Sequence, residues 1–238
     1  MPVQDEVVDR VLCIAVTTML GAVVANLRGG ALDDERAARY AAESHRWLRR
    51  ENLADSLSGA ERALVAKAPA DWSEKESIDA DWRNESLGAL LWAISAIGDM
   101  PPYDERFQDL PSRVPLLAPT AGFRRAASLR PPDELERARE IAELWHRRSR
   151  TTQPRSGGDP QAAGFDLDAI AGQPAALAHA AGSIPEPIDG DFPAYGKAYR
   201  DLAAGECSEA GAIARERRHA LNWLSGYSSD WDSVPTGT

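Results

Sequence analysis

Cysteine is scarce in this sequence, and positive charge is outweighed by negative charge. Cys13 and Cys207 are the only two cysteines among 238 residues, so a disulfide-rich scaffold and a zinc site built from several cysteines are both excluded. Lysine and arginine total 27 against 37 aspartates and glutamates, which gives a formal net charge of −10. Nucleic-acid binding needs a basic face that holds phosphates. We therefore expect no nucleic acid among the partners of this protein.

Uncharged runs long enough for a typical membrane-spanning helix are also lacking near the N-terminus. Residues 11–27 carry no charge over 17 positions, whereas a membrane-spanning helix needs about 20 mostly apolar residues. A signal peptide begins with positive charge, but here Asp5, Glu6 and Asp9 precede the run with only Arg10 to offset them. We therefore predict that residues 1–30 form a buried N-terminal helix, and we expect a cytoplasmic protein with no membrane partner.

Familiar cofactor and nucleophile motifs are missing from the sequence. It contains no Gly-x-Gly-x-x-Gly, no Gly-x-x-x-x-Gly-Lys-Ser/Thr and no Gly-x-Ser-x-Gly. The first two patterns form phosphate-binding loops, and the third places a nucleophilic serine on a sharp turn. We therefore expect no cofactor, and the sequence favours a protein that is not an enzyme.

Helical periodicity and helix-capping signals are what the sequence contains in abundance. Ser58 with Glu61, and Ser73 with Glu76, have the spacing of capping boxes, while no stretch alternates apolar and polar residues as a strand would. The pattern predicts an all-α protein of six to eight helices. The expected helices are Gln4–Leu27, Asp33–Asn52, Ser58–Lys67, Ser73–Gly98, Pro131–Arg150, Pro174–Ala181, Tyr195–Ala204 and Cys207–Leu224.

The domain organisation is predicted from the helix faces and from the proline- and glycine-rich segments between helices. We predict one helical domain over residues 1–238, because the last helix needs a partner surface for its apolar face. A proline- and glycine-rich loop near residues 151–164 opens a flexible or partly ordered insertion over residues 151–191. Residues 225–238 are predicted to form an irregular tail.

Two charged residues stand on otherwise apolar helix stripes. Glu85 shares a stripe whose apolar members are Ile78, Trp82, Ala89, Ala93 and Ala96. Arg217 falls within the stripe of the last helix, formed by Ala210, Ile213, Ala214, Leu221 and Leu224. Because charged groups are rarely buried unpaired, the pattern predicts a buried Glu85–Arg217 ion pair. The alternative role for Arg217 is bidentate binding of a substrate carboxylate or phosphate.

A second pattern suggests metal binding. Glu143 with His146, and Glu216 with His219, are both Glu-x-x-His pairs on predicted helices. Two such pairs and a glutamate from each of two other helices form the di-metal carboxylate site of helical bundles; Glu85 and Glu61 are the candidates for those two. The helical wheel opposes this hypothesis, since it points Glu143 and His219 away from the apolar stripes of their helices.

Three segments together resemble a known bacterial family. They are Trp-Arg-Asn-Glu at residues 82–85, Trp-His-Arg-Arg at 145–148, and Glu-Arg-Arg-His-Ala-Leu-Asn-Trp at 216–223 followed by Trp-Asp at 231–232. The set resembles the family called domain of unknown function 4272, over residues 35 to 238. The family brings no established activity. The resemblance draws attention to a set of structural or binding residues, namely Trp82, Arg83, Glu85, Trp92, Arg217, Asn222, Trp223, Trp231 and Asp232.

The leading functional hypothesis is a non-catalytic binding or interaction module whose partner is a protein or a small ligand. The first alternative is a helical di-metal enzyme that uses Glu143, His146, Glu216 and His219, with Glu85 contributing. Both histidines must then point into one cavity. The second alternative is a small-anion-binding protein, which requires a concave site at the guanidinium groups of Arg217 and Arg83.

Overall fold

The computed structural model describes residues 1–152 and 167–235, with side chains for 1–151 and 174–235. Its eight α-helices are α1 (Gln4–Arg28), α2 (Asp34–Arg50), α3 (Gly59–Val65), α4 (Glu74–Ala93), α5 (Ala121–Ala126), α6 (Pro132–Thr152), α7 (Leu167–Ala180) and α8 (Ala204–Leu224). Short 3-10 turns are η1 (Pro69–Asp71), η2 (Leu110–Arg113), η4 (Tyr199–Asp201) and η5 (Trp231–Ser233). The all-α prediction is confirmed.

The segment 195–204 differs from its prediction as a helix. It holds part of a two-stranded antiparallel pair, β1 (Pro193–Ala194) with β2 (Lys197–Ala198), followed by η4. Tyr195 and Gly196 both have positive φ values, 52° and 70°. A tight turn with two left-handed residues breaks helical geometry and brings the two strands together.

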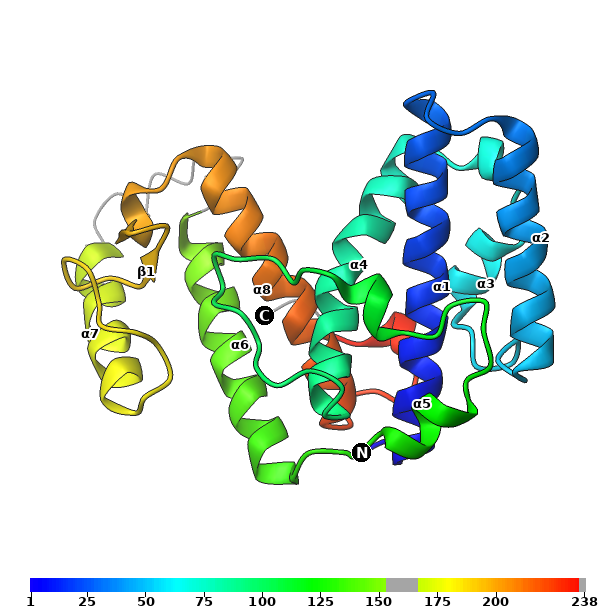
Figure 1. The fold of residues 1–238 in the computed structure, drawn as a ribbon. Coiled ribbons are helices and arrows are strands. Elements are labelled where there is room, and N and C mark those ends of the chain that lie inside the picture. The colour runs from blue at the N-terminus through cyan, green and yellow to red at the C-terminus, as the bar shows by residue number, and fades with distance from the viewer. Residues whose placement is uncertain (153–166, 236–238) are drawn as a thin grey trace.

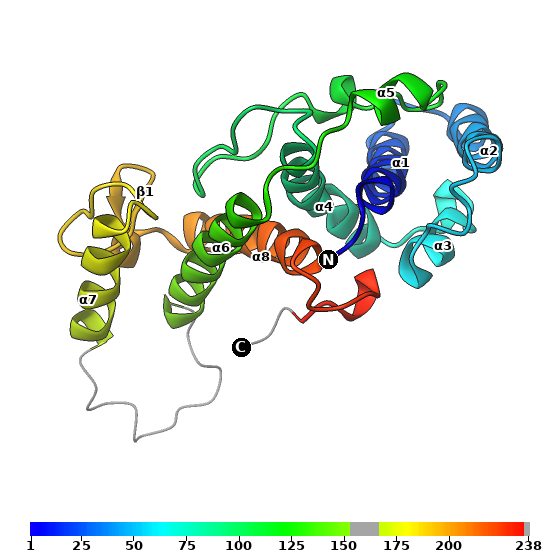
Figure 2. The same ribbon diagram turned by 90° about the horizontal axis from the view of Figure 1, so that it is seen from below.

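The helices stand side by side, with α4 near the middle of the row (Figure 1). Helix α4 packs against α1 on one side and α8 on the other, while α2 lies outside α1 and α6 outside α8. Figure 2 shows α7 and the β1–β2 hairpin at the end of the row beyond α6. The last helix therefore packs back onto the rest of the chain, as its apolar face predicted.

Helix α1 has the length and apolar composition of a membrane-spanning helix, but most of it is covered by protein. In its most apolar 18-residue window, 83% of the residues are buried. Val7, Val11, Ile14 and Val16 have no exposed surface and belong to the core cluster. The predicted buried helix over residues 1–30 thus forms a central part of the apolar core.

The predicted helix caps are present and define where α3 and α4 begin. In both capping boxes the serine hydroxyl accepts from the N3 backbone and the glutamate accepts from the serine backbone. The other end of α4 differs from the prediction, since the helix stops at Ala93 rather than near Gly98. Ser95 takes a left-handed conformation (φ 59°) and Ala96 N–H donates to the Leu91 carbonyl, which closes the helix early.

The two segments predicted to be irregular contain short ordered elements where they are described. Residues 153–166 of the expected insertion lie outside the described residues. The remainder contains α7 and the buried Asp191, whose carboxylate pairs with Arg148 on α6 at 2.6 Å. The tail forms the single turn η5, in which Trp231 is buried.

Gly88 on α4 sits where a side chain would collide with a neighbouring loop. A Cβ added there would lie 2.6 Å from Cε2 of Phe107. We expect Gly88→Ala to destabilise the protein by about 1–3 kcal/mol, because overpacking outweighs the roughly 1 kcal/mol that alanine gains in a helix. Chemical denaturation measures this. Gly122→Ala on α5 is the matched control, since nothing lies within 4 Å of its added Cβ; equal stabilities of the two variants would contradict the prediction.

Candidate functional site

The predicted Glu85–Arg217 ion pair is confirmed and lies at the centre of the molecule. Both residues have no exposed surface, and Nη2 and Nε of Arg217 each lie 2.9 Å from Oε2 of Glu85. Burial raises the pKa of Glu85, and the charge of Arg217 opposes that rise. The ion pair joins α4 to α8.

Arg217 is saturated by partners from the 101–107 loop as well. Its Nη1 donates to the carbonyls of Pro101 (2.6 Å) and Pro102 (3.1 Å), and its Nη2 donates to Glu105 O (2.6 Å). The guanidinium also lies over the Phe107 ring, 4.7 Å from its centroid. This arrangement leaves no face of Arg217 for a substrate, so the residue holds the loop in place.

Most of the family-highlighted aromatic residues bind other parts of the chain. Trp82 and Trp92 are each covered by an arginine, whose guanidinium carbon lies 4.6 Å from the ring centroid (Arg106 and Arg130). Trp223 packs against Trp231 with 5.6 Å between ring centroids. Asn222 donates to the Pro235 carbonyl at 3.1 Å and so holds the tail on α8.

The first Glu-x-x-His pair belongs to the contact between α6 and α8. Glu143 was predicted to point toward solvent, but only 14% of its side chain is exposed, and it pairs with Arg218 of α8 and Arg147 of its own helix. These arginines lower the pKa of Glu143 against the raising effect of burial. The wheel failed here because α8 contacts α6 over a wider face than the apolar stripe alone.

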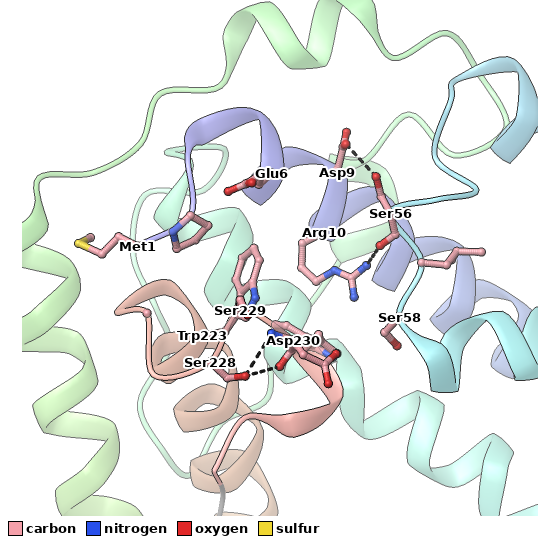
Figure 3. A pocket seen from close by; sticks show the side chains of 14 residues that line it. Met1, Glu6, Asp9, Arg10, Ser56, Ser58, Trp223, Ser228, Ser229 and Asp230 are labelled. Atoms are coloured by element: carbon pink, nitrogen blue, oxygen red, sulfur yellow. Dashed lines mark hydrogen bonds between the residues drawn. The ribbon is translucent and has the colours of Figure 1, made fainter.

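One cavity lies between the N-terminus, α1 and the tail. Its volume is about 440 Å³. Its walls include Glu6, Asp9, Arg10 and Trp223 (Figure 3). Two of its charged groups have partners within the protein. Asp9 pairs with Arg124 at 2.6 Å and accepts from Ser56, while Arg10 pairs with the buried Glu61 at 3.0 Å. These charged groups are therefore already paired within the described structure.

Another cavity, of about 310 Å³, brings together residues that sequence analysis singled out for different reasons. We call it the Arg83–His219 cavity. It lies where α3, α4, α8 and the tail meet, and its walls are Ala60, Arg83, Glu216, His219, Trp231 and Asp232. Arg83, Trp231 and Asp232 came from the family-highlighted set, and Glu216 and His219 came from the second Glu-x-x-His pair. Ala60 was not predicted.

Arg83 is the unusual group in this cavity. Its side chain is half-buried on α4, and its buried Nη1 has no hydrogen-bond partner among the described residues. Within that part of the chain it makes no ion pair either, although two carboxylates line the same space. Glu216 accepts from Ser86 (3.1 Å) and Arg215 (3.2 Å), and Asp232 accepts from Ala60 N–H at 2.8 Å.

His219 was predicted to face away from the core, but the tail covers it. The Trp231 ring packs edge-on against the imidazole, with ring centroids 4.5 Å apart. Burial and the nearby Arg83 charge lower the pKa of His219 to about 4. Its Nε2 is buried and, in the described structure, lacks a hydrogen-bond partner. The imidazole is therefore neutral at pH 7.

The two Glu-x-x-His pairs do not converge in the described structure. Glu216 and His219 line the Arg83–His219 cavity, whereas Glu143 and His146 are absent from its walls. His146 is buried on α6. Over the residues that the structure describes, no group of three or more histidine, cysteine, aspartate or glutamate side chains could hold a metal ion.

Comparison with known proteins gives one match. A family model described as domain of unknown function (DUF4272) matches residues 1–167. The predicted resemblance covered residues 35 to 238, so its family is confirmed while its extent differs. Ala60 and Arg83 lie within the matched residues, and the other four walls of the Arg83–His219 cavity lie beyond them. No curated protein and no solved structure matches the chain.

Proposed function

We propose that this chain, which belongs to the family described as domain of unknown function DUF4272, is a non-catalytic binding protein whose ligand site is the Arg83–His219 cavity. One observation carries the proposal. Two residues that line one cavity, Arg83 and His219, each have a buried polar atom (Nη1 and Nε2) without a hydrogen-bond partner in the described part of the chain.

The free-energy cost of leaving such atoms without hydrogen-bond partners favours the binding of a ligand that supplies them. A buried polar atom without a partner costs about 1–3 kcal/mol, and more when the group is charged. A bound oxygen acceptor would satisfy the Arg83 guanidinium, for which a carboxylate is the best-matched partner. A donor on the same ligand would satisfy the neutral imidazole of His219, which accepts at one nitrogen. We therefore expect a small ligand that carries a carboxylate.

The electrostatics of the cavity favour binding over catalysis. A general base works best when its pKa lies near the operating pH, and the pKa of His219 is lowered to about 4. None of the six walls is a serine, cysteine, threonine or lysine that could act as a nucleophile. The proposal includes a cytoplasmic location and partners that are neither nucleic acid nor membrane, in keeping with the net charge of −10.

The test is a binding assay with matched arginine variants. Acetate, propionate, glycine and L-alanine are titrated against the protein and followed by backbone amide NMR. We expect at least one of them to shift resonances of the cavity residues, and Arg83→Gln to weaken that binding at least about tenfold, since a bond to a charged group is worth about 1.5–3 kcal/mol. Arg113→Gln, at an exposed arginine, should leave it unchanged.

Two outcomes would overturn the proposal. One is the absence of any shift at about 10 mM of every probe, a concentration that corresponds to only about 3 kcal/mol of binding free energy. The other is equal affinity of the Arg83→Gln variant and the unchanged protein for the probe that binds.

A further inference from the structure

We infer that the ligand of the Arg83–His219 cavity is a small zwitterion of the α-amino-acid type. Its carboxylate would pair with Arg83, and its ammonium group would lie between the carboxylates of Glu216 and Asp232. This inference rests on the proposed function and deepens it, because it names the ligand class for the same site.

The charges of the cavity walls select against a simple anion. One guanidinium and two carboxylates line the space, together with a neutral imidazole, so the walls carry a net charge of −1. A multiply charged anion on Arg83 would be repelled by Glu216 and Asp232. A purely cationic ligand would leave the Arg83 guanidinium without a partner. A ligand with both charges meets each requirement.

The walls keep their opposite charges apart, which leaves room for such a ligand. Arg83 forms no ion pair with Glu216 or Asp232 in the described structure, although all three line one cavity of about 310 Å³. The carboxylates are instead held by neighbours: Glu216 by Ser86 and Arg215, and Asp232 by the Ala60 backbone. Fixed groups of this kind keep the binding geometry in place without collapsing onto one another.

The acceptors of the cavity match the three donors of an ammonium group. Oδ2 of Asp232 accepts from Ala60 N–H, and Oδ1 makes no hydrogen bond within the described residues. Oε2 of Glu216 accepts from the Ser86 hydroxyl and keeps a second lone pair, whereas Oε1 accepts two N–H groups of Arg215. The buried Nε2 of His219 is the third acceptor.

The size and the apolar walls of the cavity indicate a small side chain. A volume of about 310 Å³ lies at the lower end of the range for ligand pockets. Ala60 and the ring of Trp231 are the apolar walls, and they suit a methyl or another short aliphatic group. L-alanine is therefore the probe of choice.

A series of alanine analogues tests the ligand class by isothermal titration calorimetry. Propionate and N-acetyl-L-alanine keep the carboxylate and lose the ammonium group, and the second also resembles a polypeptide C-terminus. L-alaninamide keeps the ammonium group, loses the carboxylate and resembles a polypeptide N-terminus. We expect L-alanine to bind at least tenfold more tightly than each of the three, which corresponds to about 1.4 kcal/mol.

Near-isosteric variants test which cavity residues contact the ammonium group of the ligand and which contact its carboxylate. Asp232→Asn and Glu216→Gln remove charge while keeping an oxygen for the Ala60 and Ser86 contacts. We expect each variant to lower the affinity for L-alanine at least threefold. The affinity for propionate should stay the same or rise. Arg83→Gln should lower the affinity for both L-alanine and propionate. Circular dichroism and the melting temperature identify any variant that fails to fold, and the analogue series on the unchanged protein tests the inference independently of the variants.

The outcomes separate this inference from the proposed function. Propionate or N-acetyl-L-alanine could bind as tightly as L-alanine, with binding weakened by Arg83→Gln. In that case the inference of a zwitterionic ligand is wrong, while the proposed carboxylate site stands. Equal affinity for L-alaninamide and L-alanine would overturn the inference in favour of an ammonium site. If none of the probes of either series binds, both proposals fail.

Discussion

Arg217→Met is expected to destabilise the folded protein by about 3–5 kcal/mol, because it breaks a buried ion pair by removing one partner. Glu85 has no exposed surface. In the described structure it would keep the Phe107 N–H at 3.0 Å and the more distant Arg106 Nε at 3.8 Å as partners. The carbonyls of Pro101, Pro102 and Glu105 would lose their shared donor as well. Urea denaturation at pH 7 measures the loss as a lower midpoint.

An exposed arginine pair provides the matched control. Arg39 on α2 pairs with Glu35 at 3.2 Å, and more than 60% of each side chain is exposed. Arg39→Met should change the free energy of unfolding by less than about 1 kcal/mol. Should Arg217→Met prevent folding, Arg217→Lys keeps the charge with fewer donors and should fold with an intermediate loss. Equal midpoints for the Arg217→Met and Arg39→Met variants would contradict a structural role for the buried pair.

Acidification from pH 6.5 to about 4 is expected to remove up to about 3 kcal/mol of stability through His219 alone. Burial and the Arg83 charge lower the folded-state pKa to about 4, against 6.5 for the free side chain. The unfolded chain then binds more protons across this window, so stability rises with pH. The His219 contribution is complete above pH 6.5 and is lost as the pH falls toward 4.

His219→Gln is the control for this pH dependence, because glutamine is similar in size and does not titrate. Carboxylates whose folded-state pKa is lowered, such as Glu51, Glu143 and Asp191, also lose stabilisation in acid. Their contribution is common to both proteins and cancels in the difference. The free energy of unfolding of the unchanged protein minus that of the variant should decrease from pH 7 through 6 and 5 to 4.5. Parallel curves would show that His219 titrates normally.

Local signals carried the prediction of the helices. The boundaries of α1 and α2 agree with the sequence to within one or two residues, and the capping boxes at Ser58 and Ser73 are present. A cap depends on side chains and backbone groups within a single turn, so the sequence contains all of its parts. Ile78 shows where helical periodicity misled, since the residue is 50% exposed although it was assigned to the apolar stripe.

The ion pair was predictable although its members are far apart in the chain. Each charge stands on the apolar stripe of its own helix, and burial of both requires that they meet. Glu143 and His219 were misplaced by the same helical-wheel reasoning. A wheel describes one helix against one core, whereas Arg218 of α8 reaches Glu143, and Trp231 of the tail covers His219.

The sequence by itself determined the helices, their caps and the buried ion pair, because each depends on local geometry or on the cost of burying charge. Only the tertiary structure decided which of the highlighted residues share a cavity. Ala60, Arg83, His219 and Trp231 belong to α3, α4, α8 and the tail. Their meeting depends on how those elements pack, and helix packing permits several crossing angles for the same apolar stripes.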